Sequence, residues 1–236
     1  MNRIYLLTLL PAVLLAGLSS AAHGETRSPE IPAFTAASFG SALNVKIAVG
    51  GPQSVSMSAS NQADLDDLRF EVRDGKLRVW RERDLWDFLS FRDTTVSLTI
   101  TVPTLTSLEA MAATEVEATG LVGDDLKLAV SSASTIIAKG IDARSVTIDA
   151  SSAGRLFVDG SCEVIHAAVS SGAVVGGGKL ECVDADLEGS SGSQSAFFTS
   201  GRVKADVSSG AAISLAGHPS YVDDDETSGG NVDILD

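Results

Sequence analysis

The sequence predicts an all-β protein, a single-stranded parallel β-helix built from rungs of about 19 residues. The first observation is a Ser-Ser pair followed by Ala or Gly, which recurs from Ser131, Ser151, Ser170, Ser190 and Ser208, in steps of 20, 19, 20 and 18 residues. A fixed period in this range is the signature of a solenoid. Second, each pair follows a run that alternates apolar and polar residues, the pattern of a strand with one buried face. Third, a unit this short leaves no room for a crossover helix, so strand must stack on strand.

Each rung is expected to consist of a strand, a corner of small residues, a second strand and a glycine corner. In the first full rung, Leu126, Leu128 and Val130 alternate up to the serine pair, and Ile136 with Ala138 follows it. Glycine then tends to close the unit, where the chain needs unusual backbone freedom. The glycines concerned are Gly120, Gly140, Gly160 and Gly217.

The repeated serines are interpreted as corner-filling residues, because a narrow corner admits only small side chains. A catalytic serine is the alternative interpretation. It would need a base within hydrogen-bonding reach and an oxyanion hole, and the sequence has no Gly-x-Ser-x-Gly elbow. A serine present on every rung therefore favours the structural role.

The region before the repeats differs from them. Residues 1–24 have the features of a secretory signal peptide, namely Arg3, an apolar stretch and small residues near the end. Residues 25–33 are expected to be a flexible leader. Residues 34–105 are expected to contain antiparallel or irregular strands, including a hairpin at Asp74-Gly75, and residues 106–236 the repeat rungs.

Aromatic side chains are concentrated in one charged segment between these strands. Trp80, Trp86, Phe88 and Phe91 lie in or next to the stretch from Arg81 to Arg92. The segment is either a protruding binding loop or a cap over the open end of the β-helix, since solenoids need their terminal rungs protected. We favour the cap, and keep these four residues as the candidate binding loop.

The two cysteines, Cys162 and Cys182, each lie eight residues before a serine pair. They should therefore occupy equivalent positions on adjacent rungs, about 4.8 Å apart, within the range that a disulfide tolerates. Export to an oxidising compartment favours the bond. Two reduced, stacked cysteines are the alternative, and a metal site is not expected because structural zinc needs four ligands.

The formal net charge of −14 argues against partners that are themselves anionic. Nucleic acid is excluded on this ground, and the sequence offers no stable membrane span once the signal is cleaved. The acidic run Asp223–Glu226 lacks the spaced ligands of a calcium loop and is expected to be a solvated turn. Whether acidic clusters bind Ca²⁺ stays open.

One outward column is a further candidate for catalysis. The rung spacing stacks Lys127, Thr147, His166, Asp186 and Lys204, beside a second column with Asp149, Glu188 and Asp206. Acids and bases on such a face could cleave a polysaccharide. Mixed charges on a solvated strand, pairing across rungs, are the favoured interpretation. We therefore expect no catalytic, metal or cofactor-binding residues.

Several segments together resemble a known family. An exported chain has a strand of the type Phe-…-Val-x-Ile-x-Val over 39–49, an Asp-Gly-x-Leu-x-Val hairpin over 74–79, and a Val-x-Leu-x-Ile-x-Val-Pro-x-Leu strand over 96–105, before repeated Ser-Ser-Gly corners. The sequence Gly217-His218-Pro219 matches a closing Gly-x-Pro. These features resemble the putative auto-transporter adhesin, head GIN domain family of bacterial envelope proteins, over residues 34–236. Members commonly have Ser-Gly-Ser-Gly corners, which Ser-Ser-Gly replaces here. The resemblance implies a β-helical fold and an exported location, and no established activity.

The expected function is that of an exported, non-catalytic β-helix protein, periplasmic, secreted or on the cell surface. It would act as an adhesin or an envelope interaction module for a protein or glycan, and its end rungs could form oligomers. The first alternative is a polysaccharide lyase or hydrolase that uses His166 and Asp186. A structural spacer in the envelope is the second.

Overall fold

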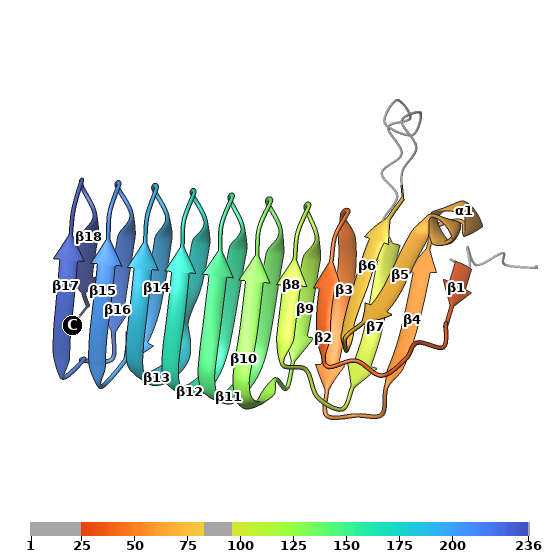
Figure 1. Ribbon diagram of the computed structural model, residues 1–236, viewed down its shortest axis with the longest axis horizontal. Helices are drawn as coiled ribbons and strands as arrows, with labels where there is room; N and C mark the ends of the chain where they lie inside the picture. Colours follow the sequence, from red (N-terminus) through yellow and green to blue (C-terminus); the bar gives the residue numbers. More distant parts are fainter. Residues whose placement is uncertain (1–24, 83–95, 236) are drawn as a thin grey trace, which may run out of the picture.

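The computed structural model describes residues 25–82 and 96–235, and its strands form one 18-stranded sheet wound into a flattened solenoid. Figure 1 shows the rungs side by side along the long axis. The predicted all-β parallel β-helix is thus confirmed. The proposed signal peptide, residues 1–24, lies outside the described residues.

Two ladders of parallel strands form the walls of the solenoid. Face A contains the strands that run into the serine corners and the strands stacked in line with them, and face B contains the strands that leave these corners and those stacked in line with them. Face A consists of β6 (Lys76–Arg81), β2 (Ala36–Phe39), β8 (Ser107–Ala110), β10 (Val122–Val130), β15 (Arg202–Val207) and β17 (Tyr221–Glu226). Face B consists of β7 (Val96–Val102), β3 (Leu43–Val49), β9 (Glu115–Thr119), β14 (Gln194–Thr199), β16 (Ala212–Ala216) and β18 (Asn231–Ile234). Three long strands start on face B and bend onto face A: β11 (Thr135–Ala150), β12 (Arg155–Val169) and β13 (Val174–Gly189).

The parallel stack reaches further toward the N-terminus than expected, and its rungs there are out of sequence order. The rung β2–β3 lies between β6–β7 on one side and β8–β9 on the other. Antiparallel strands cover the end: β5 (Leu68–Arg73) pairs with β6, β4 (Ser54–Ala59) with β7, and β1 (Glu25–Arg27) with β4. The predicted hairpin at Asp74-Gly75 joins β5 to β6.

The core is built from columns of identical register. Leu128, Ile148, Ala167, Leu187 and Ala205 face inward at the same position of successive rungs, and each is buried. A single rung cannot bury its apolar side chains alone and depends on the rungs on either side of it. Burial of these columns is therefore the main favourable contribution to stacking. One continuous cluster of buried residues runs through the solenoid.

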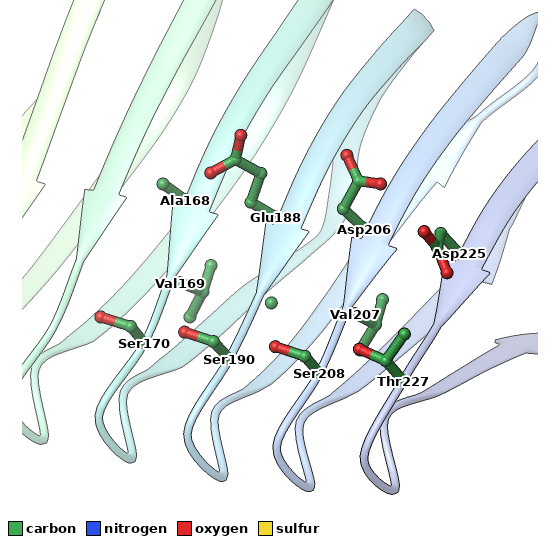
Figure 2. Close-up of a pocket in the computed structure, with 11 residues that line it drawn as sticks. Ala168, Val169, Ser170, Glu188, Ser190, Asp206, Val207, Ser208, Asp225 and Thr227 are labelled. Atoms are coloured by element: carbon green, nitrogen blue, oxygen red, sulfur yellow. The ribbon is translucent and has the colours of Figure 1, made fainter.

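Every serine corner is a two-residue turn with both central residues in the left-handed region. At Ser190–Ser193 the φ angles of Ser191 and Gly192 are 53° and 69°, and the Ser193 amide donates to the Ser190 carbonyl over 3.2 Å. This is the requirement of a type I′ turn. Each turn also bonds to the next, as where Gly192 donates to the Ser209 carbonyl over 3.0 Å. Figure 2 shows Ser170, Ser190 and Ser208 aligned where face A enters these turns.

Glycines mark the opposite corners, as the sequence predicts. Gly120, Gly140, Gly160 and Gly217 all have positive φ angles. Between β11 and β12 the strand register shifts next to Gly140, so the ladder bends there. The positive φ explains why glycine closes the unit, because other residues pay a steric penalty in this region.

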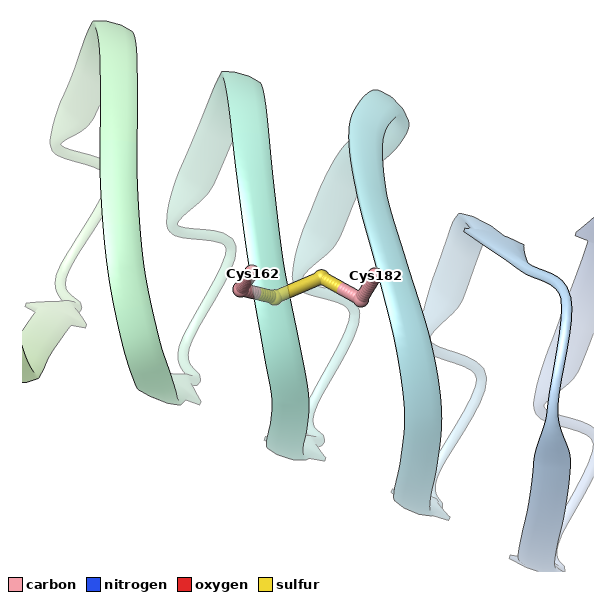
Figure 3. The surroundings of a disulfide bond; sticks show 2 residues. All are labelled: Cys162 and Cys182. Atoms are coloured by element: carbon pink, nitrogen blue, oxygen red, sulfur yellow. A yellow bond between two sulfur atoms is a disulfide. The ribbon is translucent and has the colours of Figure 1, made fainter.

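A disulfide joins the two cysteines across adjacent rungs (Figure 3). Cys162 of β12 and Cys182 of β13 are direct register partners, with their Cα atoms 4.5 Å apart. Both side chains are buried. The bond therefore lies along the solenoid axis and fixes the register of these two rungs covalently.

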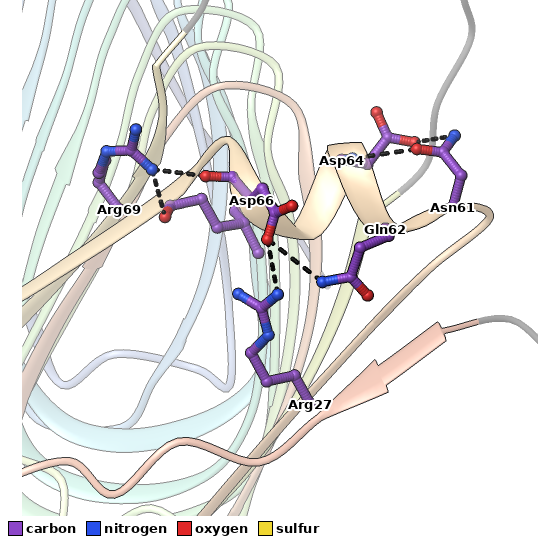
Figure 4. Close-up of polar contacts among 7 residues, drawn as sticks. Arg27, Asn61, Gln62, Asp64, Asp66 and Arg69 are labelled. Atoms are coloured by element: carbon purple, nitrogen blue, oxygen red, sulfur yellow. Dashed lines mark hydrogen bonds and ion pairs between the residues drawn. The ribbon is translucent and has the colours of Figure 1, made fainter.

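The N-terminal end carries a short helix, α1 (Gln62–Asp66). The Asn61 side chain accepts a hydrogen bond from the Asp64 amide over 3.1 Å, which caps the helix (Figure 4). Arg27 of β1 donates to Asp66 over 2.6 Å. Arg81 at the end of β6 forms an ion pair with Asp64 over 2.9 Å, and both side chains are more than 90% buried. This buried pair anchors α1 to β6.

The acidic run Asp223–Glu226 is part of strand β17 and not the expected turn. β17 continues the ladder of β15, so Asp224 and Glu226 take positions that Ala205 and Val207 occupy one rung earlier. Both Ala205 and Val207 are buried, whereas the two acids are exposed. Two apolar columns of face A therefore give way to charge at this rung, and charged residues on an edge strand discourage strand addition.

Reciprocal substitutions test the turn geometry. Gly192 and Ala153 take the same position of two corners that are separated by the corner at Gly172, with φ angles of 69° and 59°. Gly192→Ala should destabilise the protein by roughly 1 kcal/mol, and Ala153→Gly should stabilise it by a similar amount, because only glycine avoids the left-handed penalty. No atom lies within 4 Å of a Cβ added at Gly192, so packing should contribute little. Urea unfolding measures the change in the free energy of unfolding for each variant. A change of the same sign in both variants would contradict the turn assignment.

Removing the buried carboxylate tests the anchor of α1. Asp64→Asn should destabilise the protein by roughly 1.5–3 kcal/mol, because it removes the negative charge from the buried hydrogen bond between Arg81 and Asp64. Asp66→Asn is the matched control on the same helix, since the Arg27–Asp66 pair is exposed. Urea unfolding should show a much smaller loss for the control. Similar losses in the two variants would mean that the buried pair has no special role.

Candidate functional site

The column proposed for catalysis is assembled as the rung spacing indicates. Lys127, Thr147, His166, Asp186 and Lys204 are consecutive register partners on face A. The His166 Nδ1 and Asp186 Oδ2 atoms are 3.8 Å apart, and both side chains are about half exposed. This is the geometry of a solvated cross-rung pair, with both side chains open to water.

Lysines in this column bind carboxylates of the neighbouring column. Lys127 lies 2.8 Å from Asp149, and Lys204 donates to Asp206 over 2.7 Å. The hydrogen bond to the carboxylate, with its negative charge, raises the pKa of each lysine above the ordinary value. These pairs are exposed, so their contribution to stability is small. They show mixed charges pairing along and across strands.

A shallow groove of about 460 Å³ runs along face A beside the serine corners (Figure 2). Its charged lining residues are Glu188, Asp206 and Asp225, which form one row next to the row of corner hydroxyls. Within residues 25–82 and 96–235, no group of three or more His, Cys, Asp or Glu side chains is placed to hold a metal ion. The three carboxylates give this groove a negatively charged lining.

Face B carries a larger groove, of about 610 Å³, between two columns of outward side chains. The Asn44 column contains Ser97, Asn44, Glu115 and Thr135, and the Lys46 column contains Thr99, Lys46, Glu117 and Ile137. The groove thus crosses strands β7, β3, β9 and β11.

Beyond the groove, the Lys46 column continues to Phe157 and Gly176. Phe157 is 43% exposed. A Cβ added at Gly176 would lie 2.7 Å from Cδ1 of Phe157, so the ring rests over the backbone of the next rung in the space that glycine leaves. This exposed aromatic residue was not identified from the sequence, where the aromatic candidates all came from the Trp80 segment. Its signal is the 19-residue step from Phe157 to Gly176.

The candidate binding loop is described only at its start. Trp80 faces outward on β6, with 37% of its surface exposed, while Trp86, Phe88 and Phe91 lie outside the described residues. Whether the segment is a loop or a cap is therefore not tested. The end of the solenoid next to it is covered by β1, β4 and β5, as described above.

In the described stretches of the chain, helices are too short and too polar for a membrane crossing. A search of curated proteins gave no match. The solved structures with a similar fold include a putative adhesin from Bacteroides fragilis NCTC 9343, with 14% identity and a TM-score of 0.78 over 90% of this chain and 97% of that one. Another is a putative lipid binding protein from Parabacteroides distasonis ATCC 8503, with 14% identity and a TM-score of 0.69 over 92% and 98%. A putative adhesin from Parabacteroides merdae ATCC 43184 has 13% identity and a TM-score of 0.69 over 92% and 98%.

At these identities the structural likeness establishes the fold alone. The sequence itself matches the family model described as "Putative auto-transporter adhesin, head GIN domain" over residues 33–219. This match spans well over half of the chain and includes both the N-terminal rungs and most of the serine corners. The chain therefore belongs to the putative auto-transporter adhesin, head GIN domain family.

Proposed function

We propose that this protein is an exported, non-catalytic binding module that acts in adhesion or in interactions within the bacterial envelope. The observation that carries the proposal is the arrangement of outward side chains in straight columns along the solenoid, on both faces. Extended surfaces of this kind suit extended partners, as in other solenoid proteins.

Export is supported by the signal-like segment of residues 1–24 in the sequence and by family membership. The Cys162–Cys182 disulfide is consistent with it, because such bonds persist mainly in oxidising compartments. The exported site, whether periplasm, cell surface or medium, would decide which partners the module meets.

The alternative of a polysaccharide-active enzyme receives no support from the geometry. His166 and Asp186 are half exposed and 3.8 Å apart. The nearby groove, of about 320 Å³, is lined by Asp186 and Lys204 without His166. On the same face, Lys127 binds Asp149 and Lys204 binds Asp206. A role in surface charge accounts for all of these contacts.

A binding assay with whole bacterial cells and isolated envelope material tests the proposal. The purified protein should bind in a saturable manner, and soluble polysaccharides incubated with it should keep their length. His166→Ala should leave binding unchanged, because the side chain lies outside any proposed contact. Shortened polysaccharide products that disappear in His166→Ala would overturn the non-catalytic proposal. Absence of saturable binding would leave only the spacer role.

A further inference from the structure

The groove on face B differs from that on face A in its charge. Lys46, Glu115 and Glu117 are its charged lining residues, and Lys139 binds Glu117 over 2.8 Å at its edge. Within the groove these two positive and two negative side chains cancel, and Arg155 follows Thr135 in the Asn44 column one rung beyond it. The hydrogen bond from Lys139 and its positive charge hold the pKa of Glu117 below the ordinary value, which favours the charged form of this carboxylate. The groove on face A, in contrast, has three carboxylates as its charged lining.

The remaining polar groups of this groove are neutral hydrogen-bonding groups. The Asn44 amide and the hydroxyls of Ser97, Thr99 and Thr135 come from three strands, β3, β7 and β11, and open toward the same groove. Each can act as donor and acceptor. A neutral surface with donors and acceptors at regular intervals is complementary to a ligand that is itself neutral and rich in hydroxyls.

An aromatic platform lies at the end of this groove. Phe157 follows Ile137 in the Lys46 column, and its ring is supported by the Gly176 backbone. Because the ring is held against the next rung, little side-chain entropy is lost when a ligand covers it. The negative face of an aromatic ring attracts polarised C–H groups, which the faces of sugar rings present.

We propose that the Asn44 and Lys46 columns, together with Phe157, form a binding site for a neutral oligosaccharide that lies along the solenoid axis. Phe157 stacks on one sugar ring, and the columns bind hydroxyls of the others. From β7 to β12 the site crosses four inter-strand spacings, roughly 19 Å, which is longer than one sugar ring. This inference rests on the proposed binding function and names its ligand class and surface.

A glycan array with the purified protein, followed by calorimetry on the hits, tests the site. Phe157→Ser should weaken binding of neutral glycans by at least about tenfold, as for other exposed aromatic anchors. Phe157→Tyr should retain binding, because it keeps an aromatic ring at this position. Thr135→Val, which keeps shape and removes one hydroxyl, should weaken binding by about two- to tenfold.

Phe70→Ser is the matched control, since Phe70 on β5 is 40% exposed and lies away from face B. It should bind as the unchanged protein does, and thermal melts should show that all variants fold. Full binding by Phe157→Ser, or equal loss in Phe70→Ser, would overturn the site. Binding only of acidic glycans, or of none, would overturn the ligand class. If cells still bind in that case, the proposed function stands without this inference.

Discussion

Parallel stacking in one register is the constraint on which the rest of this structure depends. A rung of about 19 residues buries its apolar side chains only against identical positions of the rungs beside it. The backbone hydrogen bonds, the inward side chains and the corners must therefore recur at the same positions of each rung. The chain meets this requirement at the serine corners with two consecutive left-handed residues, which return the strand within four residues and leave amides free to bond from turn to turn.

The same constraint determines the surface. Side chains that are about one rung apart in the sequence become neighbours in a column on the surface. Like charges therefore accumulate in a column unless the sequence alternates their sign from rung to rung. His166, Asp186 and Lys204 alternate along one column of face A, whereas Glu188, Asp206 and Asp225 accumulate in the next. Face B near β9 balances its charges and adds hydroxyls and an aromatic ring. The two faces thus offer different chemistry on one scaffold.

Much of this architecture could be predicted from the sequence, because the period of the serine pairs gives the register directly. The pairing of Lys127 through Lys204 and the alignment of Cys162 with Cys182 follow from counting residues. The order of the first rungs could not be obtained in this way. The rung β2–β3 lies between β6–β7 and β8–β9, and no local pattern records which of several similar strands are neighbours. The face B groove was missed for the same reason, since Lys46 and Glu117 are partners across that reordered junction. Phe157 could have been found by aligning the outward positions of successive rungs as well as their inward positions.

Moving the disulfide by one rung is the most direct test of the register. Ala143 of β11 is the register partner of Cys162, as Cys182 is on the other side, and Ala143 is also buried. In a protein with Ala143→Cys and Cys182→Ala, position 143 should form a disulfide with Cys162, because Cα atoms of adjacent rungs lie within disulfide range. Peptide mapping by mass spectrometry should find that bond, while Cys182→Ala alone leaves one free thiol. Two free thiols under conditions that fully oxidise the unchanged protein would contradict the stacked register on which this account is based.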